Sequence, residues 1–212
     1  SFHTHAVDWY LATLPPLGVP VHHDFTWLPE RSQVAATVSS KWPVDDAKWI
    51  LLQPGARWSN KRWPLEYFSM LTRKLAAEFP KMRFAVLGGK DDAPLADELC
   101  RTVPERCLNL AGQTSLPEMI EWLRRCELLV TNDTGPMHAA AALGKPVAAV
   151  FGPTEPRRTG PYGQLERVVQ HQLPCIPCLK SRCTWSQPME CLTAISPSQV
   201  LNAVQRELKQ PA

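Results

Sequence analysis

One stretch of the chain decides its fold: Lys48-Trp49-Ile50-Leu51-Leu52-Gln53, a short apolar run that Pro54 and Gly55 close. An apolar run without alternation is typical of a strand buried on both faces of a sheet. Pro64 then opens a segment in which apolar residues recur at helical spacing as far as Phe79. A buried strand followed closely by an amphipathic helix is the repeating unit of parallel α/β folds.

The same alternation continues toward the C-terminus. Further strands are predicted at residues 83–87, 107–110, 127–131 and 146–151, with 167–170 as a candidate last strand. Helices are predicted at 91–101, from Leu116 onward, at 137–143, and from Ser196 to Leu208. Because strands alternate with helices through short loops, we expect an α/β fold: a Rossmann-like parallel sheet with helices on both faces.

Composition limits the classes of function. The 212 residues are 44% hydrophobic and carry a formal net charge of +3, which gives no reason to expect a nucleic-acid partner. No apolar run approaches the ~18 residues that a membrane-spanning helix needs. The 21 prolines are about twice the usual share, and in so hydrophobic a chain we expect them at the ends of helices and strands.

In an open parallel sheet, ligands bind beyond the carboxyl ends of the strands. The first such loop is Asp133-Thr134-Gly135-Pro136-Met137-His138. Asp133 or Thr134 can cap the next helix, Pro136 fits the first helical position, and Gly135 allows a ligand close to the backbone. Free N–H groups at a helix start form an anion site, which His138 can face. The alternative is an ordinary capped turn with His138 as a surface or core residue.

Two further loops carry charge at strand ends. Residues 54–64 contain Arg57, Ser59 and Lys61, which can neutralise or hydrogen-bond phosphates; a solvated basic loop is the alternative. After the next strand, Asp91 can bind a ribose hydroxyl, or simply stabilise a helix start.

Several nucleotide motifs are missing from the sequence. It has no Walker pattern and no G-x-G-x-x-G, which disfavours P-loop NTPases and standard dinucleotide dehydrogenases. It also has no D-x-D pair, so a metal-bridged nucleotide site has no visible ligands. We therefore expect neither a metal nor a cofactor at this site.

A cysteine cluster precedes the last predicted helix: Cys175-x2-Cys178-x4-Cys183-x7-Cys191. Four thiolates at this spacing can bind zinc or another metal. Four-cysteine zinc sites, however, usually show two C-x2-C pairs, and only one is present. Reduced thiols, or a disulfide formed on purification, are the alternatives. The other three cysteines (Cys100, Cys107 and Cys126) are expected to be buried thiols.

Three motifs in order carry a resemblance to a known family. They are Pro54-Gly55-Ala56-Arg57-Trp58-Ser59-Asn60-Lys61-Arg62-Trp63-Pro64, the Asp133–His138 loop, and Phe151-Gly152-Pro153-Thr154. On these motifs the chain resembles glycosyltransferase family 9, the ADP-heptose–lipopolysaccharide heptosyltransferases, from about His5 to the C-terminal helix.

The resemblance implies a GT-B fold, of which this chain would be the C-terminal half. Residues 1–40 would be a remnant of the N-terminal acceptor domain with the interdomain linker, 41–195 the donor-binding domain, and 196–212 a C-terminal helix. The chain begins at Ser1, and residues 1–29 have the character of a helix and linker that belong to something larger. We therefore expect a fragment whose N-terminal part is missing.

The resemblance also implies a reaction and its residues. The complete enzyme would transfer heptose from ADP-heptose to the lipopolysaccharide inner core, with inversion and without a metal. Lys61, Asp133 and His138 would be catalytic. The donor-binding residues would be Gly55, Arg57, Ser59, Lys61, Asp91, Asp133, Thr134, Gly135, Pro136, Met137, His138 and Thr154.

The acceptor, lipid A–Kdo or a heptosylated core, would bind the missing domain, which would also carry the general base. This fragment alone would then be inactive. The resemblance implies a cytoplasmic enzyme, peripheral at the inner face of the inner membrane. Two alternatives remain: a sugar-nucleotide binding module without catalysis, and a nucleotide-sugar epimerase of similar fold, against which the Pro54–Pro64 motif argues.

Overall fold

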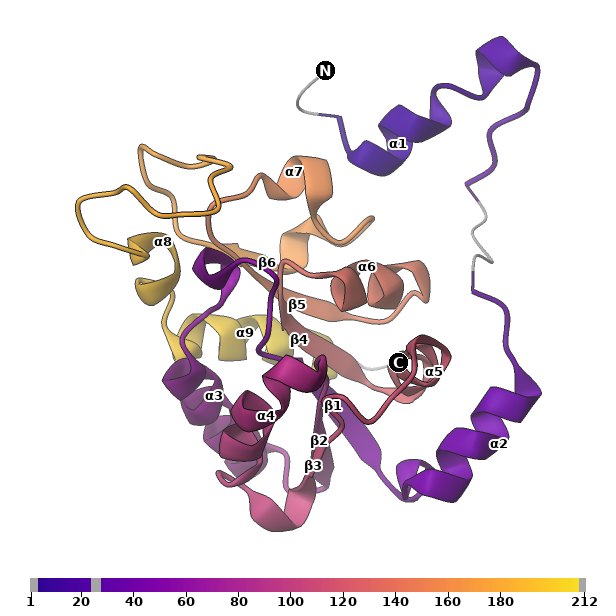
Figure 1. Ribbon diagram of the computed structural model, residues 1–212, viewed down its shortest axis with the longest axis vertical. Coiled ribbons are helices and arrows are strands. Elements are labelled where there is room, and N and C mark those ends of the chain that lie inside the picture. The colour runs from indigo at the N-terminus through magenta and orange to yellow at the C-terminus, as the bar shows by residue number, and fades with distance from the viewer. Residues whose placement is uncertain (1–3, 24–27, 210–212) are drawn as a thin grey trace.

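The sheet of the protein is entirely parallel. In the computed structural model, which describes residues 4–23 and 28–209, six strands lie in the order β3-β2-β1-β4-β5-β6 (Figure 1). The strands are β1 (Lys48–Gln53), β2 (Met82–Val86), β3 (Cys107–Asn109), β4 (Leu128–Asn132), β5 (Val147–Phe151) and β6 (Val168–Gln170). All six predicted strands are present, with ends that differ by a residue or so.

Helices cover both faces of this sheet, as expected. The first face packs against α3 (Leu65–Glu78), α4 (Ala93–Cys100) and α9 (Pro197–Leu208). The second face packs against α2 (Ser32–Lys41), α5 (Leu116–Arg125) and α6 (Gly135–Ala142). The remaining described α-helices are short: α1 (Ala6–Leu11), α7 (Pro156–Thr159) and α8 (Glu190–Thr193).

The position of β1 at the centre of the sheet explains why apolar and polar residues do not alternate in its sequence. Ile50 and Leu52 belong to the core on the α3–α9 face, whereas Trp49 and Leu51 belong to the core on the α5–α6 face. All four side chains are at most 1% exposed. Each such burial stabilises the fold by about 1.5–3 kcal/mol relative to exposure, so a polar residue within β1 is unfavourable on either face.

Two helix starts differ from the prediction. The helix expected from Asp91 begins as a 3-10 turn over Lys90–Asp92 and becomes α4 only at Ala93. Helix α6 begins at Gly135, so Pro136 is its second residue and not its first. Both positions lack an intrahelical acceptor for their N–H, which is why proline is tolerated at either one.

Helix α2 was not predicted, because few of its residues are apolar. Val38 is the only buried residue of α2, and Val34 packs against the same core while partly exposed. Arg125 of α5 instead fixes this helix through polar contacts, which include the Ala35 carbonyl at 3.3 Å and the Ser39 hydroxyl at 2.8 Å. Such contacts leave no periodic hydrophobic signal in the sequence.

The N-terminal segment contributes α1, which lies beside α7 (Figure 1). His5 caps α1, and its Nε2 lies 3.0 Å from the Gly160 carbonyl. Tyr162 donates a hydrogen bond to Asp8, which raises the pKa of the Tyr162 hydroxyl to about 12. Residues 1–3 and 24–27 of the expected helix and linker lie outside the described residues. No helix within the described ranges has the length and apolarity to cross a bilayer.

Glu118 should make the stability of the fold depend on pH. Hydrogen bonds from Lys41 of α2 and from Ser115, the cap of α5, lower its pKa to about 2. Since the folded-state pKa lies below the unfolded value, the stabilisation is complete above pH ~4.5 and is lost as the pH falls toward ~2. We expect Glu118→Gln to lower the free energy of unfolding by about 1–2 kcal/mol at neutral pH and to have little effect near pH 2.

Urea unfolding of both proteins at several pH values tests this expectation. Glu98→Gln, on the exposed surface of α4, is the matched control and should leave the curve unchanged. A difference in the free energy of unfolding between wild type and Glu118→Gln that is equally large at both ends of the pH range would contradict the expectation.

Candidate functional site

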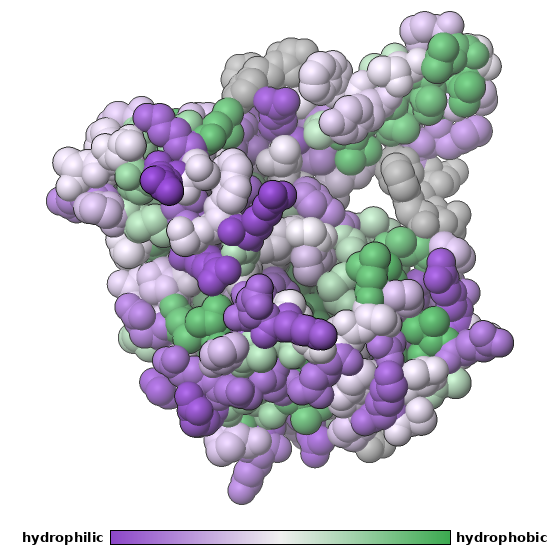
Figure 2. Space-filling view, viewed as in Figure 1, coloured by the Kyte–Doolittle hydropathy of each residue, from purple (hydrophilic) through white to green (hydrophobic). Residues whose placement is uncertain are grey.

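Because the strands are parallel, their carboxyl ends meet at one edge of the sheet, and a cavity of about 700 Å³ lies there. In the sheet, β2 lies on one side of β1 and β4 lies on its other side, so the strand order reverses between β1 and β4. The edge where these two strands end therefore holds the topological switch point, at which α/β folds bind ligands. Figure 2 shows hydrophilic side chains gathered around a hollow on this face. The cavity is lined by Gln53, Gly55, Ala56, Arg57, Trp58, Lys61, Arg62, Gly89, Asp91, Asp92, Asp133, Thr134, Gly135 and His138.

One buried side chain closes the loop that carries Arg57 and Lys61. Asn132, the last residue of β4, donates from Nδ2 to the Pro54 carbonyl at 2.8 Å. Its Oδ1 accepts from the Trp63 backbone N–H at 3.0 Å. The two ends of the loop are therefore tied to the same strand end, which fixes where its basic residues lie.

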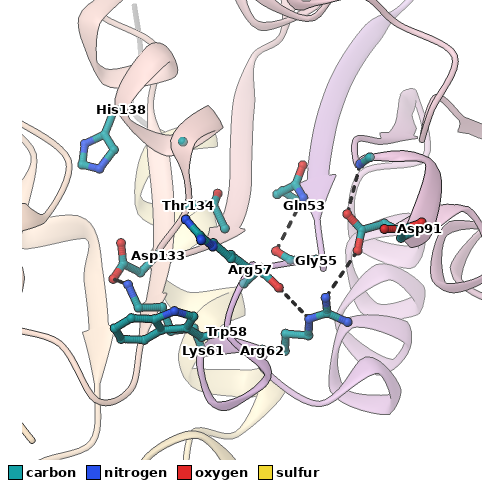
Figure 3. A pocket seen from close by; sticks show the side chains of 14 residues that line it. Gln53, Gly55, Arg57, Trp58, Lys61, Arg62, Asp91, Asp133, Thr134 and His138 are labelled. Carbon is teal, nitrogen blue, oxygen red and sulfur yellow. Dashed lines mark hydrogen bonds and ion pairs between the residues drawn. The ribbon is translucent and has the colours of Figure 1, made fainter. Parts of the chain in front are cut away.

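Lys61 and Asp133 form the charged centre of the cavity. Lys61 Nζ lies 2.6 Å from Asp133 Oδ2, and the side chains are only 19% and 8% exposed (Figure 3). Thr154 donates to the same carboxylate oxygen at 2.8 Å. The Lys61 ammonium also lies 5.0 Å from the centre of the Trp58 ring, within cation–π range. The ammonium is thus held in place by an acid and an aromatic face.

The start of α6 borders the same space. The Thr134 side chain makes no capping hydrogen bond to α6, and its hydroxyl lies 3.0 Å from that of Thr131. The N–H groups of the first turn therefore remain available to a bound anion. His138, one turn along, has a lowered pKa because it is partly desolvated, and the Asp133 carboxylate opposes that effect. Its imidazole is neutral at pH 7 and can donate or accept a hydrogen bond.

Asp92 holds two strand-end loops together. Its carboxylate accepts from the Gly89 N–H at 3.0 Å and lies 3.8 Å from the Arg62 guanidinium. Arg62 in turn donates from Nε to the Ala56 carbonyl at 2.8 Å. A Cβ at Gly55 would lie 2.5 Å from Asp92 Oδ2, so only glycine leaves room for this carboxylate.

A second cavity of about 400 Å³ shares four lining residues with the first: Trp58, Lys61, Asp133 and His138. Its other walls come from α1, from α7 with Thr154, and from Leu179. The Lys61–Asp133 pair therefore stands between two spaces. This arrangement suits a ligand whose charged middle joins two larger groups.

The structure brings together most of the residues that the sequence singled out. The first cavity contains Gly55, Arg57, Lys61, Asp91, Asp133, Thr134, Gly135 and His138, and Thr154 lines the second. Ser59, Pro136 and Met137 are not among the described residues that line either one. The Met137 side chain is fully buried in the core and positions α6.

Six residues that line the first cavity were not predicted from the sequence: Gln53, Ala56, Trp58, Arg62, Gly89 and Asp92. One signal was available for Gln53, because a lone polar residue ends an otherwise apolar strand. No sequence signal pointed to Asp92, since its neighbour Asp91 offers the same carboxylate.

The cysteine cluster lies beside the site. Cys175, Cys178, Cys183 and Cys191 line one small cavity of about 60 Å³. Burial and the neighbouring thiols raise the pKa of Cys191 to about 11. Across the described part of the chain, all seven cysteines are free, and no group of three or more His, Cys, Asp or Glu side chains is arranged to hold a metal ion. The four thiols of this spacing thus lie around one small cavity.

Two of the other three cysteines are buried as expected, and the third is not fully so. Cys107 and Cys126 are buried and Cys100 is half-buried. The Sγ atoms of Cys100 and Cys107 are 2.9 Å apart, so these two thiols share a hydrogen bond.

Comparison with known proteins identifies relatives of this chain. Residues 3–188 match the model of glycosyltransferase family 9 (heptosyltransferase). Lipooligosaccharide heptosyltransferase 2 of Haemophilus influenzae is 35% identical over 55% of this chain and 35% of its own length. Lipooligosaccharide heptosyltransferase 2 of Campylobacter jejuni is 29% identical over 74% of this chain and 50% of its own. The chain thus spans between a third and a half of these relatives.

Solved structures give the same picture. The structure of E. coli ADP-heptose lipopolysaccharide heptosyltransferase II has a TM-score of 0.73 at 26% identity, over 91% of this chain and 56% of its own. A glycosyltransferase family 9 protein from Veillonella parvula has a TM-score of 0.79 at 23% identity, over 97% of this chain and 60% of its own. The second likeness concerns the fold alone.

The Asp92 contact predicts a coupled pair of substitutions. Gly55→Ala places a Cβ against the Asp92 carboxylate, so we expect it to lower the free energy of unfolding by about 1–3 kcal/mol. Gly89→Ala is the control, because its Cβ would lie 3.9 Å from Asp92 Oδ2, an ordinary contact. Urea unfolding measures both.

Removing the carboxylate should relieve the clash. In an Asp92→Ala background, Gly55→Ala should lose most of its effect on the free energy of unfolding. Equal losses from Gly55→Ala with and without Asp92 would show that the two positions do not interact.

Proposed function

The chain belongs to glycosyltransferase family 9, the heptosyltransferases, and we propose that it is the donor-binding part of an enzyme that transfers heptose from ADP-heptose to the inner core of lipopolysaccharide. The observation that carries this proposal is the Lys61–Asp133 pair at the start of α6, inside a cavity at the switch point of the sheet. The likeness to the E. coli ADP-heptose lipopolysaccharide heptosyltransferase II supports the choice of donor.

The chemistry of glycosyl transfer matches these groups. As the bond to the sugar breaks, positive charge develops on the sugar and negative charge on the departing diphosphate. In our proposal the Lys61 ammonium and the N–H groups at the start of α6 stabilise that diphosphate. Because the positive charge comes from the protein, we propose a metal-independent reaction. Thr134, Gly135 and His138 would contact the phosphates and the sugar, and Arg57 would add charge at the rim.

The two cavities divide the donor between them in this proposal. The nucleoside would occupy the larger cavity, where Asp91 lies in the 3-10 turn after β2 and would hold a ribose hydroxyl. The sugar would lie toward the second cavity, with Thr154 in its wall. Asp133 would then act mainly by holding Lys61.

The acceptor side is proposed from the family. The relatives are at least twice as long as the matched part of the chain. We propose that the acceptor domain, which binds lipid A–Kdo or a heptosylated core, is the part of the enzyme that this chain lacks, with residues 1–40 leading into residues 41–195. That domain would supply the general base of an inverting reaction. We place the enzyme in the cytoplasm, peripheral at the inner membrane.

Calorimetry with ADP, UDP and ADP-heptose tests the donor. We expect this chain to bind ADP and ADP-heptose and to bind UDP much more weakly. Binding of ADP-heptose without turnover in the complete enzyme would favour the alternative of a sugar-nucleotide binding module. Failure of all three to bind would contradict the proposal.

Lys61→Ala in the complete enzyme tests the proposed stabilisation of the leaving group. We expect turnover to fall by about 10²–10³ while the fold persists, as for the loss of one preorganised contact to developing charge. The control is Lys81→Ala, an exposed lysine before β2 at the opposite edge of the sheet, which should keep full turnover. Near-normal turnover of Lys61→Ala, with intact circular dichroism, would overturn the assignment.

A further inference from the structure

Two backbone groups directly after Cys178 tie the cysteine loop, which joins β6 to α8, to other parts of the chain. The Leu179 N–H donates to the Pro153 carbonyl at 3.0 Å. The Lys180 carbonyl accepts from Asn60 Nδ2 at 2.7 Å, and Asn60 is only 4% exposed. The part of the loop that follows Cys178 is therefore anchored to two segments that are distant from it in the sequence.

Each of those two segments carries, as its next residue, a partner of the Asp133 carboxylate. Thr154 directly follows Pro153 and donates to Asp133 Oδ2 at 2.8 Å. Lys61 directly follows Asn60, and its Nζ lies 2.6 Å from the same oxygen. A displacement of the loop is therefore transmitted through one residue on each side to both partners of Asp133.

Leu179 has an unfavourable backbone conformation. Its φ is 54°, in the left-handed region that the Cβ of an L-residue disfavours. A residue keeps such a conformation only while its surroundings hold it. Because the Leu179 residue is 46% exposed, it depends on the hydrogen bond to Pro153 more than on packing. A change of backbone torsion at the preceding Cys178 therefore favours the release of Leu179 from Pro153.

Two thiols of the cysteine cluster, Cys175 and Cys178, are suited to reversible oxidation. Both are half-buried, so an oxidant can reach them. Two residues separate them, which is the spacing of dithiols that alternate between the reduced and the disulfide form. Cys191, in contrast, is buried and has a raised pKa of about 11, so it stays protonated at neutral pH. Cys183 Sγ accepts a hydrogen bond from the Met189 N–H at 3.4 Å.

We propose that Cys175 and Cys178 form a reversible disulfide, and that this bond loosens the hold of the cysteine loop on Lys61 and Thr154. The charged centre is then firmly held only while the dithiol is reduced. The consequence for nucleotide binding rests on the proposed function, whereas the disulfide and the release of Leu179 do not.

The oxidant in this proposal is a low-molecular-weight disulfide such as oxidised glutathione. One thiolate of the pair attacks a sulfur of oxidised glutathione, and one glutathione thiolate leaves. The second thiolate attacks the resulting mixed disulfide, which forms the Cys175–Cys178 bond and releases the second glutathione. The pair loses two protons and two electrons, which convert one glutathione disulfide into two thiols.

Mass spectrometry of the chain after treatment with oxidised glutathione locates the disulfide. Trypsin cleaves after Arg167 and Lys180, which places Cys175 and Cys178 together in the peptide 168–180, apart from the other cysteines. We expect this peptide to become lighter by two hydrogen atoms, to resist alkylation, and to regain both thiols on reduction. Oxidation that spares this peptide, or that joins it to another one, would overturn the inference.

Amide hydrogen exchange measures the release of the loop without any ligand. The Leu179 amide should exchange faster in the oxidised chain than in the reduced chain, because its hydrogen bond to Pro153 is lost. Cys178→Ser cannot form the disulfide and should keep slow exchange under both conditions. Unchanged exchange at Leu179 in a chain that carries the disulfide would overturn the inference.

Calorimetry with ADP measures the effect on the site. Oxidised wild type should bind ADP about threefold to tenfold more weakly than reduced wild type, as for the loss of one hydrogen bond. Cys178→Ser should bind ADP equally well under both conditions, and Cys175→Ser serves in its place if that variant does not fold. Two controls should keep the wild-type difference: Cys183→Ser, at another half-buried thiol of the loop, and Cys100→Ser, which removes the close pair with Cys107.

Three outcomes would count against the coupling. Equal affinity of reduced and oxidised wild type for ADP would overturn it, and so would a loss of affinity that persists in Cys178→Ser. A metal ion that copurifies with the chain and protects the four thiols from oxidation would also overturn it, because the thiols would then be ligands. If reduced wild type does not bind ADP, the proposed function fails, while the disulfide and the release of Leu179 are still decided by the mass and exchange measurements.

Discussion

The constraint on which the structure depends is that both faces of a parallel sheet are covered by helices. The central strands are then mostly apolar, and their buried polar side chains gather near the strand ends. Gln53 ends β1 and Asn132 ends β4 under this rule. Asn132 is fully buried, yet both groups of its amide are bonded, to the Pro54 carbonyl and the Trp63 N–H. The strand ends therefore shape the site and the loop above it together.

The charged centre, the Lys61–Asp133 pair, is already formed without a bound ligand. Lys61 is mostly buried, so its ammonium needs a partner, and Asp133 supplies it at 2.6 Å. An ammonium has three donors, and this pair uses one of them, which leaves two for an incoming phosphate. Asp133 is itself held by Thr154 and Trp58 packs near Lys61. The cation is thus already desolvated and oriented, which is the condition under which electrostatic stabilisation is strongest.

Much of the fold could be predicted from the sequence, because hydrophobic periodicity reports burial. The strands, α3 and α9 carry that signal, whereas α2 does not, since Arg125 fixes it through a carbonyl and a hydroxyl. The site was predictable where a residue type has one role, as at Lys61. Asp91 was predicted, but its neighbour Asp92 was not, because the two are adjacent acids of equal chemistry. The contacts of Asp92 with Arg62 and Gly55 separate the two acids, and those contacts join loops far apart in the sequence.

The cysteine spacing shows a second limit of sequence patterns. Cysteines with two or four residues between them lie close in most loops, so proximity follows from the spacing, whereas ligand geometry does not. In the described structure the loop is fixed by other means. The Leu179 N–H donates to the Pro153 carbonyl at 3.0 Å, and Asn60 Nδ2 donates to the Lys180 carbonyl at 2.7 Å. Because Asn60 directly precedes Lys61, the cysteine loop and the segment that carries the ammonium are held against each other. A change in this loop that breaks the Asn60–Lys180 bond therefore acts one residue from the charged centre.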